Sequence, residues 1–151
     1  MEASEPVDVE TVLAPVDGSE ESATAVEYAV AIADRYDASV HALFVLGREV
    51  VLGMDAGAVD ESDVAATARQ FLDDVGHLAD DQEVPVTTST AHGFSPVRKT
   101  HHPGSVVLDA ADEVGADLIV LPRESTEDAA EVLEKAAEYV LSYASQPVLS
   151  V

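Results

Sequence analysis

The chain of 151 residues contains no cysteine. Disulfide bonds, thiolate catalysis and cysteine-based zinc sites are therefore excluded, which suits a protein of a reducing compartment. No apolar run reaches the roughly 18 residues that a membrane span requires. The acidic start, residues 1–10, also lacks the basic and apolar regions of a signal peptide. From the sequence we expect a cytoplasmic protein that does not associate with membranes.

Basic residues are scarce. Seven lysines and arginines face thirty aspartates and glutamates, and the formal net charge is −23. Such a chain repels phosphate groups, so nucleic acids and anionic membranes are excluded as general partners. Only two of the basic residues are lysines, Lys99 and Lys135. In molar salt the Debye length falls to about 3 Å, which screens the repulsion between acids, and we therefore expect a salt-loving host.

Short apolar runs alternate with segments of helical periodicity. The runs predict strands at residues 11–15, 39–46, 84–91, 117–122 and 147–151. Apolar residues at steps of three and four predict helices around residues 25–36, 64–78, 107–114 and 132–143. The last helix is preceded by Ser125 and Asp128, which have the spacing of a capping box.

This alternation predicts one α/β domain over residues 1–151, in which helices cover both faces of an open, parallel, five-stranded sheet. Residues 1–10 are expected to form an acidic N-terminal extension. Residues 47–61 show no clear period, and residues 93–104 are polar, so both segments are interpreted as variable loops.

Three segments have distinctive sequences: Val12–Ser19 (VLAPVDGS), Gly115–Pro122 (GADLIVLP) and Ala137–Val151 (AEYVLSYASQPVLSV). Together they resemble the universal stress protein family, and the order of the elements matches that family over nearly the whole chain. The resemblance implies an adenine-nucleotide alpha-hydrolase-like fold, a role in stress response and a homodimer that pairs the last strand of each subunit. That strand comprises Pro147, Val148, Leu149, Ser150 and Val151.

The glycine motif of the family's nucleotide-binding members, G-x2-G-x9-G-[ST], is missing. No glycine follows Gly115, Pro122 or its neighbours stand at the first glycines, and Glu134 and Lys135 stand at the final Gly-Ser pair. A triphosphate would meet three carboxylates there and one cation, Arg123. The same carboxylates also stabilise the start of a helix. We therefore expect no cofactor and no ATP binding in the family's usual way.

The nucleoside half of the family's site is better preserved. The resemblance implies that Asp17, after the first strand, and Val45, near the end of the second, correspond to the residues that contact adenosine. A structural interpretation is equally simple, because Asp17 can cap the following helix together with Glu20, and Val45 can lie in the core. Both interpretations stay open at the level of the sequence.

A basic segment interrupts the acidic chain. Residues 84–108 contain no carboxylate, and within them lie Arg98, Lys99, His101 and His102. In a parallel sheet this loop lies at the carboxyl ends of the strands, where ligands of such folds bind. The segment therefore predicts either an anion site or a patch for an acidic partner. The alternative is a surface loop that pairs with the protein's own acids.

Neither a metal site nor a catalytic residue is expected. His92, His101 and His102 are close in sequence, but adjacent side chains seldom ligate one ion, and no carboxylate stands nearby to complete a set. There is no G-x-S-x-G elbow and no lysine in an apolar setting. Two hypotheses follow. One is a non-enzymatic dimer that acts on an unknown protein partner, and the other is an AMP or ATP sensor whose phosphates are held by residues 98–102.

Overall fold

The computed structural model of the chain describes residues 7–95, 97, 101–122 and 131–151, and these form one five-stranded parallel sheet with the strand order β3-β2-β1-β4-β5. The strands are β1 (Thr11–Val16), β2 (Ser39–Leu46), β3 (Val86–His92), β4 (Leu118–Leu121) and β5 (Val148–Ser150). The helices are α1 (Glu20–Tyr36), α2 (Arg48–Asp55), α3 (Glu61–Asp81), α4 (Pro103–Val114) and α5 (Glu131–Tyr143). The predicted sheet is confirmed.

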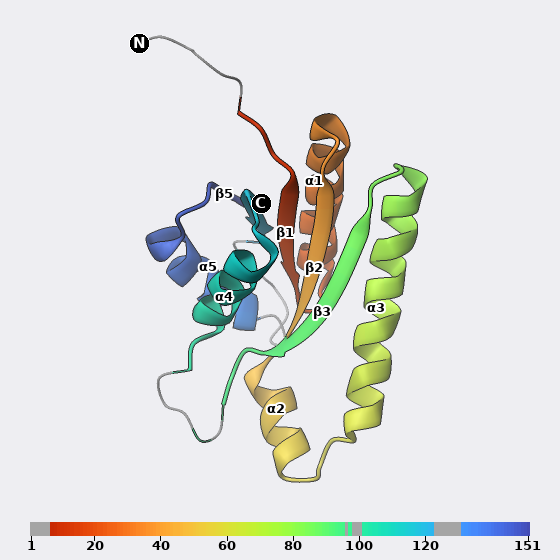
Figure 1. The fold of residues 1–151 in the computed structure, drawn as a ribbon. Coiled ribbons are helices and arrows are strands. Elements are labelled where there is room, and N and C mark those ends of the chain that lie inside the picture. Colours follow the sequence, from red (N-terminus) through yellow and green to blue (C-terminus); the bar gives the residue numbers. More distant parts are fainter. Residues whose placement is uncertain (1–6, 96, 98–100, 123–130) are drawn as a thin grey trace.

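Helices cover both faces of the sheet (Figure 1). Helices α1 and α3 pack on one face, and α4 and α5 pack on the other. Successive residues of β1 supply the two cores in turn, because side chains of a strand alternate between its faces. Val12 and Ala14 belong to the α1–α3 side, and Leu13 belongs to the α4–α5 side. Both cores are built from short aliphatic side chains, as expected for a sheet buried on both faces.

The interpretation of residues 47–61 as an irregular loop was wrong, because α2 occupies Arg48–Asp55. Gly53, in the second half of the helix, obscured its pattern. That glycine lies against the next segment, since a Cβ there would stand 2.4 Å from Cγ2 of Val59. Val51 anchors the helix in the core. Glycine is unfavourable inside a helix, but here the close approach of Val59 leaves no room for a larger residue.

Helix ends also differ from the sequence pattern. Ser19, not Asp17, is the N-cap of α1, and its Oγ accepts the Ser22 N–H. His102 caps α4, which begins at Pro103 inside the predicted 93–104 loop. Gly115 ends α4 in the left-handed conformation, with φ of 67°, which a glycine adopts readily. The predicted capping box of α5 lies outside the described residues.

The predicted N-terminal extension, residues 1–10, is integrated into the fold where the structure describes it. Val9 is buried in the α1–α3 core. The Asp117 carboxylate accepts the backbone N–H groups of Glu10 and Thr11, at 2.9 and 3.1 Å. This contact joins the start of β1 to the start of β4 and places the two strands side by side.

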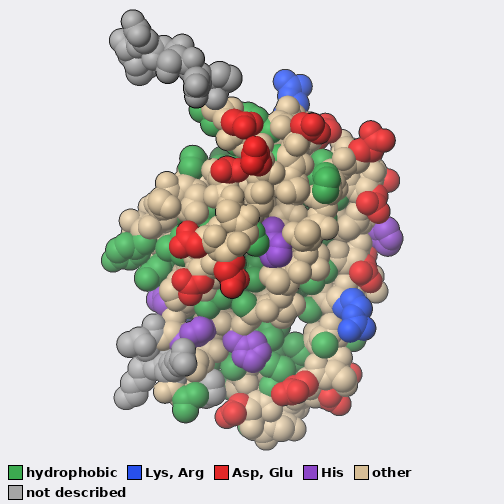
Figure 2. All heavy atoms as spheres, viewed as in Figure 1, with side chains coloured by type: hydrophobic (Ala, Val, Ile, Leu, Met, Phe, Trp, Pro, Cys, Tyr) green, Lys and Arg blue, Asp and Glu red, His purple; other side chains and the backbone are tan. Residues whose placement is uncertain are grey.

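The surface reflects the composition, because carboxylates are spread widely over the face shown in Figure 2 and lysine and arginine side chains are sparse on it. Among the helices of the described residues, none has both the length and the apolar character of a membrane span.

Candidate ligand-binding site

A cavity of about 250 Å³ lies at the carboxyl edge of the sheet. It is called the edge pocket here, and segments that follow three different strands form it: the start of α2 after β2, the turn after β3 with the start of α4, and the first turns of α5 after β4. Its lining comprises Gly47, Arg48, Glu49, Val50, Gly93, Phe94, His101, His102, Pro103, Val132 and Lys135. Ligands of open α/β sheets bind at this edge.

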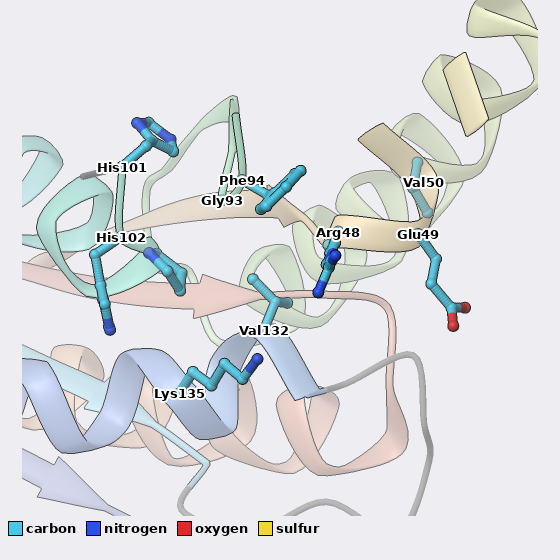
Figure 3. Close-up of a pocket in the computed structure, with 11 residues that line it drawn as sticks. Arg48, Glu49, Val50, Gly93, Phe94, His101, His102, Val132 and Lys135 are labelled. Carbon is cyan, nitrogen blue, oxygen red and sulfur yellow. The ribbon is translucent and has the colours of Figure 1, made fainter. Parts of the chain in front are cut away.

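Two cationic side chains reach the edge pocket from opposite sides. Figure 3 shows Arg48, from α2, and Lys135, from α5, pointing toward the space beside Val132. The Arg48 guanidinium carbon lies 5.3 Å from the centre of the Phe94 ring, a cation–π contact that holds the guanidinium in place. Positive charge is therefore concentrated here, although the chain as a whole is strongly acidic.

His102 connects the edge pocket to the packing of α4. Its Nδ1 accepts the Gly104 N–H at 2.9 Å, so the ring hydrogen is on Nε2. The ring stacks on Tyr139 of α5 with centroids 4.5 Å apart. Gly104 packs against the same tyrosine, since a Cβ at Gly104 would lie 2.4 Å from the Tyr139 Cβ. The position of His102 is thus fixed by both helices.

His101 is held by the end of β3. Its Nε2 lies 2.8 Å from the His92 carbonyl oxygen, and because a carbonyl only accepts, Nε2 is the donor. The side chain of His92 lines a different groove, together with residues of α3. The three histidines that are close in sequence therefore do not line one cavity. Within the described part of the chain, no group of three or more metal-ligating side chains is close enough to hold an ion.

Asp17 and Val45 lie at the same edge of the sheet but do not line the edge pocket. Asp17 Oδ1 accepts the Ser19 N–H at 3.0 Å, whereas its Oδ2 is buried and has no hydrogen-bond partner in the described structure. Val45 is 1% exposed and belongs to the α4–α5 core. It stands directly behind the pocket wall, since a Cβ at Gly93 would lie 2.7 Å from its Cγ1.

The Universal stress protein family matches residues 9–151. The chain belongs to the universal stress protein family. Solved structures agree with the match. The universal stress protein UspA from Lactobacillus plantarum is 23% identical, with a TM-score of 0.69 over 97% of this chain and 99% of that one. No match is found among curated proteins.

Two further universal stress proteins of the same fold were solved with a nucleotide. One, in complex with cAMP, is 21% identical, with a TM-score of 0.67 over 96% of this chain and 98% of that one. Another, from Archaeoglobus fulgidus and in complex with dAMP, is 20% identical, with a TM-score of 0.63 over 94% of this chain and 96% of that one. At these identities the likeness establishes the fold.

The structure describes only part of the predicted basic loop. His101 and His102 line the edge pocket, whereas Arg98 and Lys99 lie outside the described residues. Arg48 was not predicted as a site residue, because residues 47–61 were interpreted as a loop. The available signal was its position, because it follows the end of β2 by two residues and so had to lie at the carboxyl edge.

His41 has a structural environment. It is 8% exposed on β2, with Nδ1 2.6 Å from Thr87 Oγ1 and Nε2 2.8 Å from Ser89 Oγ, both on β3. Burial lowers the pKa of His41 below its usual value, and the Glu113 carboxylate partly opposes this shift. The neutral ring therefore joins two neighbouring strands through side-chain hydrogen bonds.

Proposed function

We propose that this universal stress protein is a non-enzymatic receptor for an adenine mononucleotide such as AMP, bound at the edge pocket. The observation that supports this most directly is the gathering of Arg48, Lys135 and two histidines around one cavity of a chain whose net charge is −23. Cations placed in a concave, partly apolar site attract a small anion in spite of the overall charge.

The proposal that the ligand is a nucleotide is supported by the relatives and by the residues of the site. Two proteins of this fold were solved with cAMP and with dAMP, each of which carries one phosphate. Phe94 and Val132 give the pocket an apolar wall. At the same edge, the unpartnered Oδ2 of Asp17 is an acceptor suited to an exocyclic amine of a base. These features match a ligand with one anionic and one heteroaromatic end.

The hydrogen bonding of His102 favours binding over catalysis at this residue. The only lone pair of the neutral His102 ring is at Nδ1, and it caps α4, so this histidine is not available as a general base. The carboxylate of Glu49 points away from Arg48 in Figure 3. We therefore propose a receptor that holds its ligand unchanged.

The first experiment is to purify the protein in concentrated potassium chloride, identify small molecules released on denaturation, and titrate the emptied protein calorimetrically with AMP. We expect AMP to be released or to bind at one molecule per chain. An empty protein that binds neither AMP, ATP nor adenosine would contradict the receptor function. The remaining account would then be a dimer that acts on a protein partner.

A homodimer through β5 is part of the proposal. β5 forms one edge of the sheet, next to β4. Ile119 N–H donates to Pro147 O, and Val151 N–H donates to Leu121 O. Residues 147 and 151 therefore turn their backbone groups toward β4, and residues 148 and 150, which alternate with them, turn theirs to the free edge. A second copy of the strand can pair there and remove the exposed edge.

Ser150→Pro tests this dimer because proline removes one outward N–H group and leaves the bonds to β4 in place. We expect light scattering to show a dimer for the unchanged protein and a monomer with the same circular dichroism for the variant. Ser150→Ala is the matched control, since it keeps the N–H group and should stay dimeric. A proline variant that remains a dimer would place the interface elsewhere.

A further inference from the structure

We infer that the nucleotide's phosphate binds between Arg48 and Lys135 at the N-terminus of α2, and that this site takes one phosphate and discriminates against a triphosphate. The inference rests on the proposed function and assigns the anionic end of the ligand to named side chains. It uses α2, a helix that the sequence pattern did not reveal.

Arg48 is the central element of this phosphate site. A guanidinium presents its N–H donors in a planar fork that matches two phosphate oxygens at once. The contact with Phe94 restricts the guanidinium before any ligand arrives, so less conformational freedom is lost on binding. Arg48 itself is exposed, and its side chain is therefore not needed for the packing of the fold.

Lys135 supplies a second positive charge from the opposite wall. It lies on α5, one turn after Val132, and points toward the same space as Arg48 (Figure 3). An ammonium group is a compact point charge with three donors. Together the two side chains bracket a phosphate between α2 and α5.

The backbone of α2 adds to this field. The helix begins at Arg48, and its N-cap, Gly47, makes no side-chain hydrogen bond to the first turn. Gly47, Arg48, Glu49 and Val50 all line the edge pocket, so the start of the helix faces the cavity. N–H groups and the positive end of the helix dipole favour an anion at this place.

The neighbouring helix contributes a side chain instead. His102 Nδ1 already accepts the Gly104 N–H at the start of α4, so that backbone group is occupied. The hydrogen of the ring is on Nε2, and His102 lines the edge pocket. His102 therefore forms part of the pocket wall on the α4 side.

The size and the surroundings of the pocket favour a single phosphate. Its volume of about 250 Å³ is below the roughly 300–1,000 Å³ of pockets that enclose a whole drug-sized ligand. A longer phosphate chain would approach Glu49, which lines the same pocket, and would then meet a protein surface of high negative charge.

Calorimetric titration of the full chain with adenosine, AMP and ATP, in potassium chloride at one fixed concentration, tests this phosphate site. We expect AMP to bind about tenfold or more tightly than adenosine, as charge-assisted hydrogen bonds to a phosphate imply, and ATP to bind more weakly than AMP. Arg48→Gln and Lys135→Gln should each reduce the preference for AMP over adenosine and leave adenosine affinity unchanged. Inorganic phosphate should compete with AMP and not with adenosine.

Arg69→Gln is the matched control, because Arg69 lies on α3 and lines the separate groove beside β3. It should bind all three ligands like the unchanged protein. If AMP binds the Arg48 and Lys135 variants as tightly as the original, or if ATP binds as well as AMP, the phosphate lies elsewhere and the inference is wrong. That result would leave the receptor function intact, whereas failure of adenosine and AMP to bind at all would remove the receptor function itself.

Discussion

Replacing Gly93 by alanine is expected to destabilise the fold and to weaken binding at the edge pocket. The new Cβ would lie 2.6 Å from Val132 Cγ2, 2.7 Å from Val45 Cγ1 and 3.0 Å from the Leu46 carbonyl oxygen. Both valines are buried, and the carbonyl belongs to β2, so the space can open only if α5 or the β3 turn moves. Overpacking of this kind costs about 1–3 kcal/mol of unfolding free energy.

The loss of affinity follows from the same contacts. Val132 lines the pocket one turn before Lys135, so a displaced α5 changes the spacing between Lys135 and Arg48. Urea unfolding followed by circular dichroism gives the stability, and titration with AMP gives the affinity. We expect both to fall in the same variant.

Gly76→Ala is the control for this substitution. Gly76 lies inside α3, and nothing stands within 4 Å of the Cβ that alanine would add. Alanine is the better helix former, so this variant should gain about 0.5–1 kcal/mol. A loss of unfolding free energy at position 93 and a gain at position 76 would show that close packing, and not the loss of a glycine as such, determines the change in stability. Equal stability of the Gly93 variant and the unchanged protein would mean that the turn after β3 yields easily.

The layers of this universal stress protein were predictable from its apolar patterns. Buried strands leave continuous apolar runs, such as residues 118–122, and amphipathic helices leave steps of three and four. The pattern failed at α2 because a short helix that contains a glycine has too few apolar positions to establish a period. Gly53 is explained only by Val59, which approaches it after the chain has turned back.

The type of residue that caps a helix start was predictable from the sequence, but the position of the cap was not. Asp17 and Ser19 are both residues that favour an N-cap, and only the geometry of the turn selects Ser19. His102 is an unusual cap, chosen because stacking on Tyr139 holds its ring over the start of α4. Such a choice depends on Tyr139, a residue of a later helix, which local preferences do not contain.

The residues of the candidate site were likewise predictable only in part. Histidines 101 and 102 were identified from a gap in the acidic pattern, and they do line the pocket. Arg48 and Lys135 are isolated basic residues in sequence, and only the placement of α2 and α5 at the carboxyl edge of the sheet brings them together. In the sequence, Lys135 stands at a position where the family's glycine motif has another residue, so it was interpreted as a sign that the motif is lost. In the folded chain the same residue adds positive charge to the pocket.

Replacing Leu13 by alanine is expected to cause a large loss of stability. Leu13 is fully buried on β1, the central strand, and belongs to the α4–α5 core. In the register of the sheet it pairs with His41 of β2 and Ile119 of β4. Removing a large buried aliphatic side chain leaves a cavity and costs about 2–5 kcal/mol. Urea unfolding in concentrated potassium chloride measures the change.

The same substitution at Leu141 is the control for burial, because this α5 leucine is 56% exposed. Leu141→Ala should change stability by less than about 0.5 kcal/mol, as surface substitutions do. Native domains are stable by only about 5–15 kcal/mol, so the Leu13 variant gives up a large share of the total. A Leu13 loss below about 1 kcal/mol would show that α4 and α5 close over the gap. The two helices would then be adjustable relative to the sheet, and the spacing of Arg48 and Lys135 would adjust with them.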